Sequence, residues 1–336
     1  MDLYSCSKTM KIAMFHSLPR GGALRVFEEQ YSYLHKKYSV KKFSIDIATS
    51  SNRLISDYLN FVELRNKHKK LALKVNDTFD VALIHPDKYT QAPFILRYLN
   101  IPTLYYAEEW LRIAYEKQFA FTDRSHYLKY IYEIATRQYR KKVDRDNARA
   151  ATMLVGNSRF TANNIMQAYD KDAEYIHPGV DLRVFRKYRV KKKNQLIYVG
   201  ATDKPNGYAF AKKIAKKAQL ELKIIHGNKL TDVELAKEYC RSIATLCVSR
   251  YEPFGLVSIE SQACKTPVLA IREGGFIETI KNNKSGYLLP REVDAFVRKI
   301  DLIKKGKQFD YSHINNFSWN EHNRKLEKMV LSLAND

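Results

Sequence analysis

The sequence predicts an α/β protein built as two Rossmann-like domains in series, each a parallel sheet with helices on both faces. Short apolar stretches rich in β-branched and aromatic residues alternate with longer amphipathic ones, as in β–α repeats. A chain of 336 residues also exceeds one domain of ordinary size. The polar, basic stretch Arg186–Asn194 separates two such patterns. We therefore expect one domain over residues 1–185 and a second over 186–306.

The expected elements follow from this alternation. Strands of the first domain are predicted at Lys11–His16, Phe43–Thr49, Phe79–His85, Thr103–Tyr106, Thr152–Gly156 and Glu174–His177. Helices are predicted there at Ala23–Lys37 and Thr90–Leu99, with one or two long helices in Tyr115–Ala150. In the second domain, strands are predicted at Gln195–Gly200, Leu222–Gly227, Ile243–Ser249 and Pro267–Ile271, with helices at Tyr208–Ala218 and Leu256–Cys264. Residues 307–336 are expected to be helical, chiefly around Trp319–Leu333.

Composition points to the cytosol. No apolar run approaches the roughly 20 residues that span a bilayer. The polar start does not resemble a signal peptide. The four cysteines are scattered and form no C-x-x-C pair, which favours neither a zinc site nor a disulfide framework. We predict a cytoplasmic protein.

The net charge is +22, because the chain has 58 Lys and Arg but only 36 Asp and Glu. Such a chain attracts anions, whether nucleic acid, an acidic membrane face or phosphorylated small molecules. The plainer explanation is solvated lysine on helix surfaces, such as Lys212-Lys213. No recognisable nucleic-acid-binding module accompanies the charge, so nucleic acid is not an expected partner.

The turn from Arg250 to Glu260 is the strongest candidate for chemistry. It follows a predicted strand and opens a helix, and Pro253 and Gly255 favour a tight turn. The unpaired amides of a helix start attract phosphate, an effect of roughly 0.3–1 kcal/mol when exposed. Glu252 before the helix and Glu260 inside it could accept hydroxyl groups at two ends of an elongated ligand. The residues fit equally a helix with a favourable acidic start.

The spacing of Glu252 and Glu260 resembles the E-x7-E motif of the retaining GT-B glycosyltransferases of family 4 (glycosyl transferases group 1). The stretches that follow, Ser261–Val268, Gly274–Glu278 and Ser285–Leu289, are similar to that family as well. Upstream, Gly156–Thr161 resembles its N-S-x-F turn and His177–Phe185 its P-G-V-D-x-x-x-F segment. The resemblance implies two domains facing a central cleft, with the last helix packing back on the first domain.

The resemblance also implies roles for individual residues. Glycines after the first strand let a backbone approach a ligand closely, and in the family this loop approaches the donor diphosphate and sugar. Glu260 would bind the ribose and Glu252 the transferred sugar, while helix-start amides would stabilise the leaving diphosphate. The candidate donor-binding residues are Gly21, Gly22, Arg25, Lys204, Arg250, Phe254, Gly255, Leu256 and Glu260. The candidate catalytic residues are Glu252, Glu108 and Lys204.

Two departures from the family pattern stand out. Its usual phosphate-binding arginine and lysine correspond to Ala201 and Asn206, which leaves Lys204 as the local cation. The usual active-site histidine corresponds to Glu108, which could accept a hydrogen bond from a sugar hydroxyl, act as a base, or merely begin a helix.

The reaction implied by the resemblance moves a sugar from a nucleoside diphosphate to an acceptor hydroxyl with retention of configuration. No metal or other cofactor is expected. Asp170-Lys171-Asp172 is interpreted as a surface turn and Asp144-Arg145-Asp146 as an exposed helical face, and no histidines have metal-ligand spacing.

The acceptor is expected to be a glycan or a lipid-linked molecule. The basic, tyrosine-rich stretch Tyr127–Lys142 fits contact with an anionic membrane. It also fits a solvated helix pair that packs its tyrosines, Ile131 and Ile134 inward.

Three rival functions stay open. A sugar phosphorylase or nucleotide-sugar epimerase would use the same phosphate turn. A non-catalytic nucleotide-sugar-binding protein is suggested by Ala201 and Glu108. A nucleic-acid binder is suggested by charge alone.

Overall fold

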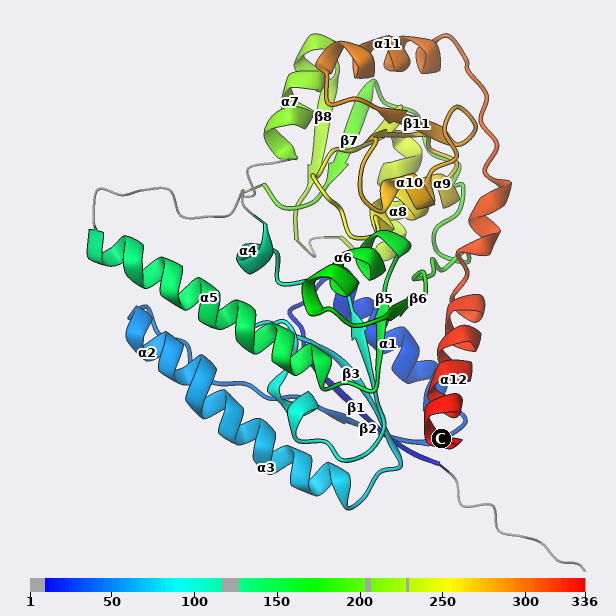
Figure 1. Ribbon diagram of the computed structural model, residues 1–336. Coiled ribbons are helices and arrows are strands. Elements are labelled where there is room, and N and C mark those ends of the chain that lie inside the picture. The colour runs from blue at the N-terminus through cyan, green and yellow to red at the C-terminus, as the bar shows by residue number, and fades with distance from the viewer. Residues whose placement is uncertain (1–9, 117–126, 203–206, 228–229, 336) are drawn as a thin grey trace, which may run out of the picture. The chain divides into compact units, whose positions relative to one another are not determined.

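The chain divides into two compact units in the computed structural model, which describes residues 10–116, 127–202, 207–227 and 230–335 (Figure 1). Unit 1 comprises Met1–Asn157, Thr161–Ile176 and Asn323–Asp336. Unit 2 comprises Ser158–Phe160 and His177–His322. The final helix, α12 (Trp319–Asn335), therefore starts in unit 2 and continues in unit 1.

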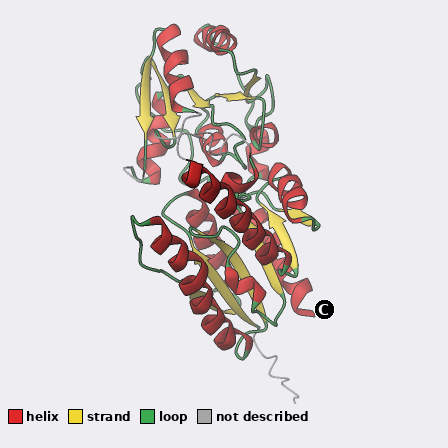
Figure 2. Ribbon diagram, turned by 60° about the vertical axis from the view of Figure 1, so that its left-hand side comes forward, coloured by secondary structure: helices red, strands yellow, loops and turns green. Residues whose placement is uncertain are grey.

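Unit 1 contains a six-stranded sheet in the order β2-β1-β3-β4-β5-β6, with every pair parallel. The central strands β3 and β4 are buried along their whole length, as expected when helices cover both faces. Figure 2 shows these helices in red against the yellow strands. The strands are β1 (Lys11–Ser17), β2 (Ser39–Phe43), β3 (Val81–Asp87), β4 (Thr103–Ala107), β5 (Met153–Gly156) and β6 (Ala173–Tyr175).

The helices of this part of the chain follow the strands in alternation. They are α1 (Gly22–Leu34), α2 (Arg53–Tyr58), the π-helix η1 (Leu59–Glu63), α3 (Leu64–Asn76), the 3-10 helix η2 (Phe94–Arg97), α4 (Arg112–Tyr115), α5 (Tyr127–Arg149) and α6 (Arg159–Tyr169). The α2–η1 segment lies beside α5, since Asp57 accepts hydrogen bonds from Tyr132 and Arg140 (Figure 1).

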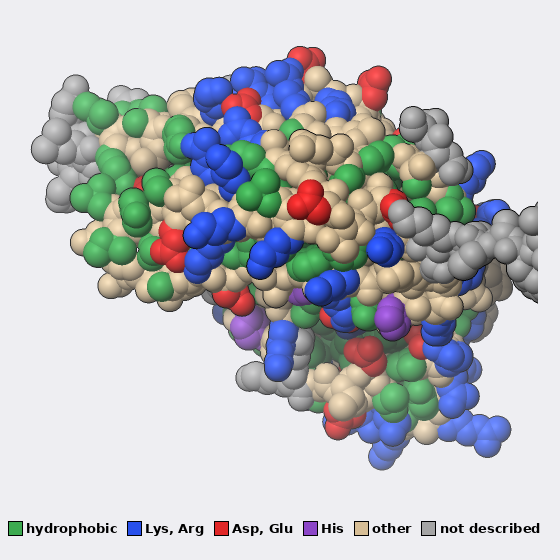
Figure 3. Space-filling model, turned by 90° about the horizontal axis from the view of Figure 1, so that it is seen from below, with side chains coloured by type: hydrophobic (Ala, Val, Ile, Leu, Met, Phe, Trp, Pro, Cys, Tyr) green, Lys and Arg blue, Asp and Glu red, His purple; other side chains and the backbone are tan. Residues whose placement is uncertain are grey.

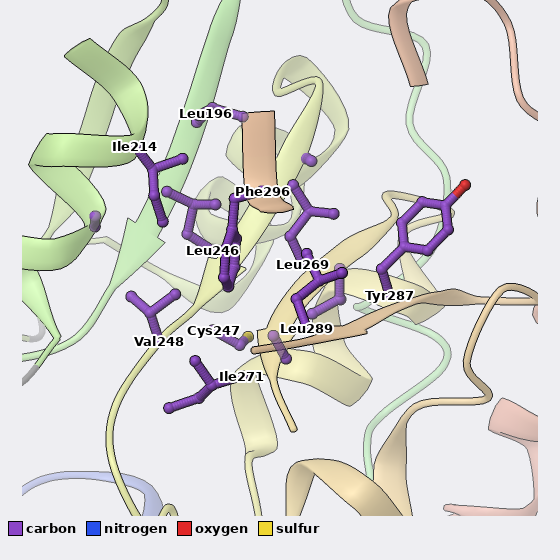
Figure 4. Close-up of a cluster of buried hydrophobic side chains, with 14 of the residues drawn as sticks. Leu196, Ile214, Leu246, Cys247, Val248, Leu269, Ile271, Tyr287, Leu289 and Phe296 are labelled. Atoms are coloured by element: carbon purple, nitrogen blue, oxygen red, sulfur yellow. The ribbon is translucent and has the colours of Figure 1, made fainter. Parts of the chain in front are cut away.

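Unit 2 contains a five-stranded parallel sheet in the order β11-β10-β9-β7-β8. Its strands are β7 (Gln195–Val199), β8 (Glu221–Ile225), β9 (Ala244–Cys247), β10 (Val268–Ile271) and β11 (Gly286–Leu289). Its helices are α7 (Tyr208–Lys217), α8 (Asp232–Arg241), α9 (Leu256–Ala263), α10 (Phe276–Thr279), α11 (Val293–Lys304) and the 3-10 helix η4 (Ser312–Asn316). Figure 4 shows Leu246 and Leu269 of adjacent strands in one apolar core with Phe296 of α11. Two parallel α/β sheets confirm the predicted fold class.

Two predicted elements of unit 1 are wrong. The strand expected at Phe43–Thr49 lies earlier, at Ser39–Phe43, and residues 44–50 have no regular structure. Ile47 is buried and Ile45 half-buried there without a strand, and side chains from elsewhere bind their backbone: Ile45 N donates to the Ser17 hydroxyl and Ile47 N to the Tyr89 hydroxyl. The helix expected at Thr90–Leu99 is only a short 3-10 turn, and the sequence analysis missed α2, η1 and α3 altogether.

The C-terminal part of α12 is bound to α1 through one carboxylate. Glu327 accepts hydrogen bonds from Tyr33 (2.7 Å), Tyr38 (2.8 Å) and Lys37 (2.9 Å). Leu326, Val330 and Leu333 are buried on the same helix. These contacts explain why residues from Asn323 onward belong to unit 1.

On the face shown in Figure 3, Lys and Arg side chains outnumber Asp and Glu. Within the described ranges, no helix is long and apolar enough to cross a bilayer.

Candidate functional site

The predicted site residues of unit 2 follow the carboxyl ends of its strands. The loop with Ala201 follows β7, the Arg250–Leu256 turn follows β9, and the Gly274–Gly275 pair follows β10. Because these strands are parallel and adjacent, all three loops lie at one edge of the sheet. In open α/β sheets ligands bind at this edge.

The turn after β9 depends on Gly255. This residue precedes α9 in the left-handed region (φ 97°), and a Cβ there would lie 2.8 Å from the Phe276 ring. Both the backbone conformation and the available space therefore require glycine. No side chain caps the start of α9 by a hydrogen bond. The Arg250–Leu256 turn thus presents a helix start of the kind that binds anions.

The glycine pair Gly274–Gly275 packs against this turn. Gly275 N donates to Glu252 O at 2.8 Å. A Cβ on Gly274 would lie 2.6 Å from Glu252 O, and one on Gly275 would lie 2.5 Å from both Phe254 Cα and Pro253 O. The two loops therefore pack backbone against backbone, which fixes the position of the turn.

The two glutamates of the motif have different environments. Glu252 is partly exposed and lines a small pocket with Gly255, Tyr198 and Ser249. Glu260 is only 4% exposed, and its Oε2 accepts a hydrogen bond from the buried Tyr239 hydroxyl at 3.0 Å. Glu260 is thus held inside unit 2, whereas Glu252 lines the pocket.

Arg250 and Phe254 flank the turn. Arg250 is exposed. The Phe254 side chain is buried, with its ring 5.5 Å from that of His177 and 5.9 Å from that of Phe317. Phe254 can therefore offer a ligand only its backbone.

A cluster around Glu278 lies beside this turn, and its residues are not among the predicted site residues. The Glu278 carboxylate accepts hydrogen bonds from Arg159 N and Phe160 N at the start of α6, and lies 2.7 Å from His177 Nε2. Ser158 Oγ donates to Pro253 O. His177 and Glu278 are separated by 101 residues, so no local spacing could have paired them.

The site residues of unit 1 also follow strand ends. Gly21 lies between β1 and α1, Gly22 is the first residue of α1, and Glu108 follows β4, again at the carboxyl edge of a parallel sheet. Gly21 is exposed and extended (φ 162°), and a Cβ there would meet nothing within 4 Å. The fold itself therefore does not require glycine at this position. Arg25 lies in the first turns of α1, where its N–H donates to Gly21 O.

Glu108 has an unusual environment for a carboxyl group. Asn157 Nδ2 donates to its Oε2 at 3.0 Å and to its carbonyl oxygen at 2.8 Å. Its Oε1 is buried without a hydrogen-bond partner among the described residues. Burial raises the pKa of Glu108 to about 8, and the neighbouring Glu109 acts in the same direction. At neutral pH the group is therefore mainly protonated, with its proton on the oxygen that Asn157 does not occupy.

The loop after β7 is described only in part. Lys204, predicted as the phosphate-binding cation, lies outside the described residues, and so does Asn206. Ala201 O accepts a hydrogen bond from the Tyr198 hydroxyl at 3.1 Å. A Cβ on Gly207 would lie 2.7 Å from the same hydroxyl oxygen, so Tyr198 shapes both ends of the loop.

Two acidic groups outside the predicted site are buried in unit 1. Asp144 is fully buried, so the interpretation of Asp144–Asp146 as an exposed helical face is wrong for this residue. Its Oδ1 accepts a hydrogen bond from Ala92 N, which supports the carboxyl group on the inward face of α5. Burial raises the pKa of Asp144 to about 8 and that of Asp87 to about 6. In the described part of the chain, no cluster of His, Cys, Asp or Glu is arranged to hold a metal ion.

Known structures share this fold over nearly the whole chain. Sucrose-phosphate synthase from Thermosynechococcus elongatus aligns with a TM-score of 0.73 at 16% identity, covering 96% of this chain and 99% of its own. Anabaena HepE, solved in complex with UDP and glucose, aligns with a TM-score of 0.69 at 14% identity, covering 97% and 100%. At such identities the likeness shows the fold, which is GT-B.

Sequence relatives match shorter stretches. A probable sucrose-phosphate synthase of Thermosipho melanesiensis is 40% identical over 114 residues, which is 31% of this chain and 26% of the relative. A D-inositol 3-phosphate glycosyltransferase of Streptomyces bingchenggensis is 25% identical over 231 residues, or 51% of each chain. The chain thus spans about a quarter to a half of these relatives. Residues 179–318, which include the whole turn after β9, match the family described as glycosyl transferases group 1.

Proposed function

We propose that this protein is a retaining glycosyltransferase that takes a nucleoside-diphosphate sugar as donor and an acceptor hydroxyl as nucleophile. The observation that carries the proposal is the turn after β9: Gly255 opens α9 without a side-chain cap, with Glu252 beside it and Glu260 within the helix. HepE, which has a similar fold, was solved with UDP and with UDP-glucose, which supports a uridine nucleotide as the first donor to test.

In the proposed reaction the amides of Gly255 and Leu256 stabilise the charge that develops on the departing diphosphate. The exposed Gly21 backbone approaches the diphosphate and sugar, and Arg25, Arg250 and Lys204 supply cations. Glu252 holds the transferred sugar and Glu260 the ribose hydroxyls. We propose that the reaction needs no metal and takes place in the cytosol, and both statements remain predictions.

Glu108 is proposed as the acid–base or hydrogen-bonding group of unit 1. Its pKa near 8 leaves a proton on an oxygen that has no partner among the described residues, so a sugar hydroxyl could accept that hydrogen bond. When deprotonated, the same oxygen could accept a proton.

Thermal unfolding with UDP, GDP, ADP and their sugar conjugates tests the proposal. A ligand at a hundred times its dissociation constant adds about 2.7 kcal/mol of stability. We expect one nucleotide to stabilise the wild type and Glu260→Gln to lose that response. The matched control is Glu292→Gln, an exposed glutamate of unit 2 whose side chain makes no capping bond.

Product analysis separates the rivals. Transfer to an added acceptor with the donor's anomeric configuration, read by NMR, supports the proposal. Product from donor alone indicates an epimerase, and product from phosphate and a glycoside indicates a phosphorylase. Nucleotide binding without turnover over a broad acceptor panel favours the non-catalytic protein.

A lipid-linked acceptor at an anionic membrane is favoured by one observation. Ile131 and Ile134 on α5 are 45% and 42% exposed, so the alternative that packs them inward is wrong. Leu54, Ile55 and Tyr58 on the neighbouring α2 are more than half exposed. An apolar surface flanked by Arg and Lys is typical of helices that lie on anionic membranes.

Co-sedimentation with phosphatidylglycerol vesicles tests membrane contact. We expect Ile131→Ser with Ile134→Ser to reduce the bound fraction severalfold. Leu73→Ser with Leu302→Ser, which removes two apolar side chains elsewhere that are comparably or more exposed, should not. Equal loss in both variants, or no binding by the wild type at low salt, would contradict the contact.

A further inference from the structure

A second concave site lies in unit 2, away from the turn after β9. It is a groove of about 590 Å³, within the usual range for small-molecule sites. Five lysines line it, and we call it the lysine groove: Lys187, Lys192, Lys265, Lys304 and Lys307.

The lysine groove is at the opposite edge of the sheet from the proposed donor site. Lys192 precedes β7, Ile243 precedes β9 and Pro267 precedes β10, and all three residues line the groove. These are the amino ends of the strands, whereas the donor-site turns follow their carboxyl ends. The groove is therefore separate from the site of the proposed reaction.

The lining combines unneutralised positive charge with an apolar floor. None of the residues that line the groove is acidic, and Ile243, Ile303 and Phe309 provide apolar surface. Among the described residues, the ammonium groups of Lys187, Lys304 and Lys307 have no carboxylate within ion-pair distance. Three separate segments bring these lysines together, so the fold holds mutually repelling positive charges at one place.

Two lysines are held in place at the groove. Lys192 Nζ donates to Ser242 O at 2.8 Å. Lys265 follows the end of α9 in the left-handed region (φ 59°), the position where helices usually have glycine. Its ammonium lies 5.4 Å from the centre of the Tyr311 ring. The chain thus keeps a lysine where glycine would be the less strained residue.

We propose that the lysine groove binds a small soluble organic anion that carries two or more phosphate groups. Lysine ammonium groups bind phosphate as point charges, and several of them suit several phosphates. The apolar floor suits the carbon body that carries these phosphates. A concave groove of this volume fits a small molecule better than a flat membrane or a duplex.

Isothermal titration calorimetry with inositol hexakisphosphate tests the proposal, at physiological ionic strength and with UDP present to occupy the proposed donor site. We expect one ion bound per chain, and no binding of unphosphorylated inositol. The triple variant Lys265→Gln, Lys304→Gln, Lys307→Gln should weaken binding by about tenfold or more. The matched control Lys69→Gln, Lys70→Gln, Lys74→Gln removes the same charge from exposed positions of α3 and should change affinity less than about twofold.

Lys265→Gly distinguishes a binding role from a structural one. Glycine relieves the left-handed backbone, so the melting temperature should stay the same or rise while affinity falls severalfold. Unchanged affinity in this variant and in the triple variant would overturn the proposal. So would equal weakening by the control triple, binding of several ions per chain, or no binding by the wild type below millimolar probe. The calorimetric measurement does not depend on glycosyl transfer, so it tests the lysine groove even if the proposed reaction is wrong.

Discussion

Gly275 of unit 2 and Gly21 of unit 1 follow strand ends in the same way, yet the fold requires only the first. Both have backbone angles that alanine adopts readily, αR at Gly275 and extended at Gly21. A Cβ on Gly275 would lie 2.5 Å from the backbone of the next loop, whereas one on Gly21 would meet nothing within 4 Å. A glycine without room is explained by packing. A glycine with open space around it needs another explanation, and a ligand is the one that our proposal supplies.

The largest effect on stability is expected at Gly275, which has no room for a Cβ. Gly275→Ala pushes a methyl group into Phe254 Cα and Pro253 O, neither of which can rotate away. We expect unit 2 to lose about 2–4 kcal/mol of unfolding free energy, as other overpacked sites do. Urea unfolding measures this loss, and a change below about 0.5 kcal/mol would show that the two loops can separate at little cost.

The next effect depends on pH and concerns Glu108. Its pKa is raised in the folded protein, so the folded state binds more protons than the unfolded one between about pH 4.5 and 8. The protonated form contributes stability that is complete below pH 4.5 and is lost as the pH rises through 8. In Glu108→Gln the amide oxygen can still accept the hydrogen bond from Asn157, and the side chain does not titrate, so stability is not lost as the pH rises. We expect the variant to gain on the order of 1–3 kcal/mol over the wild type at pH 8 and little at pH 4.5.

Unfolding curves of the wild type and of Glu108→Gln at several pH values test this gain. The buried Asp144 is a second carboxyl group that affects the pH dependence of the wild type. Asp144 has a raised pKa for the same reason, but it lies on α5 and is not among the predicted site residues. A wild-type stability that is flat between pH 5 and 8 would contradict the assignment for both groups.

An effect of similar size is expected at the buried Tyr239 hydroxyl, which donates to Glu260. Tyr239→Phe removes a donor from a carboxylate that is almost inaccessible to water, which costs about 1–3 kcal/mol. The same variant should weaken binding of the stabilising nucleotide, because Glu260 loses a contact that fixes its orientation. A binding isotherm separates the two effects. Weaker folding with unchanged nucleotide affinity would show that Glu260 is structural only.

The sequence could predict what depends on neighbouring residues. Alternating apolar stretches indicated the parallel sheets, and the spacing from Glu252 to Glu260 indicated the turn and helix of α9. The sequence could not predict structure that depends on contacts between residues distant along the chain. The apolar residues after Phe43 are typical of a strand, yet side chains from elsewhere bind the backbone of Ile45 and Ile47. The burial of Asp144, the pairing of His177 with Glu278, and the orphan oxygen of Glu108 all depend on residues distant in sequence.

The smallest effect on stability is expected at Gly21. Gly21→Ala adds a methyl group in open space on extended backbone, so the unfolding free energy should change by less than about 0.5 kcal/mol. If the backbone at Gly21 approaches the donor as proposed, the same methyl group will raise KM for the nucleotide sugar or lower kcat at least tenfold. Full activity with unchanged stability would mean that neither the fold nor the ligand needs glycine there. In that case the loop before α1 would lose its place in the proposed donor site, while the turn after β9 would keep its own.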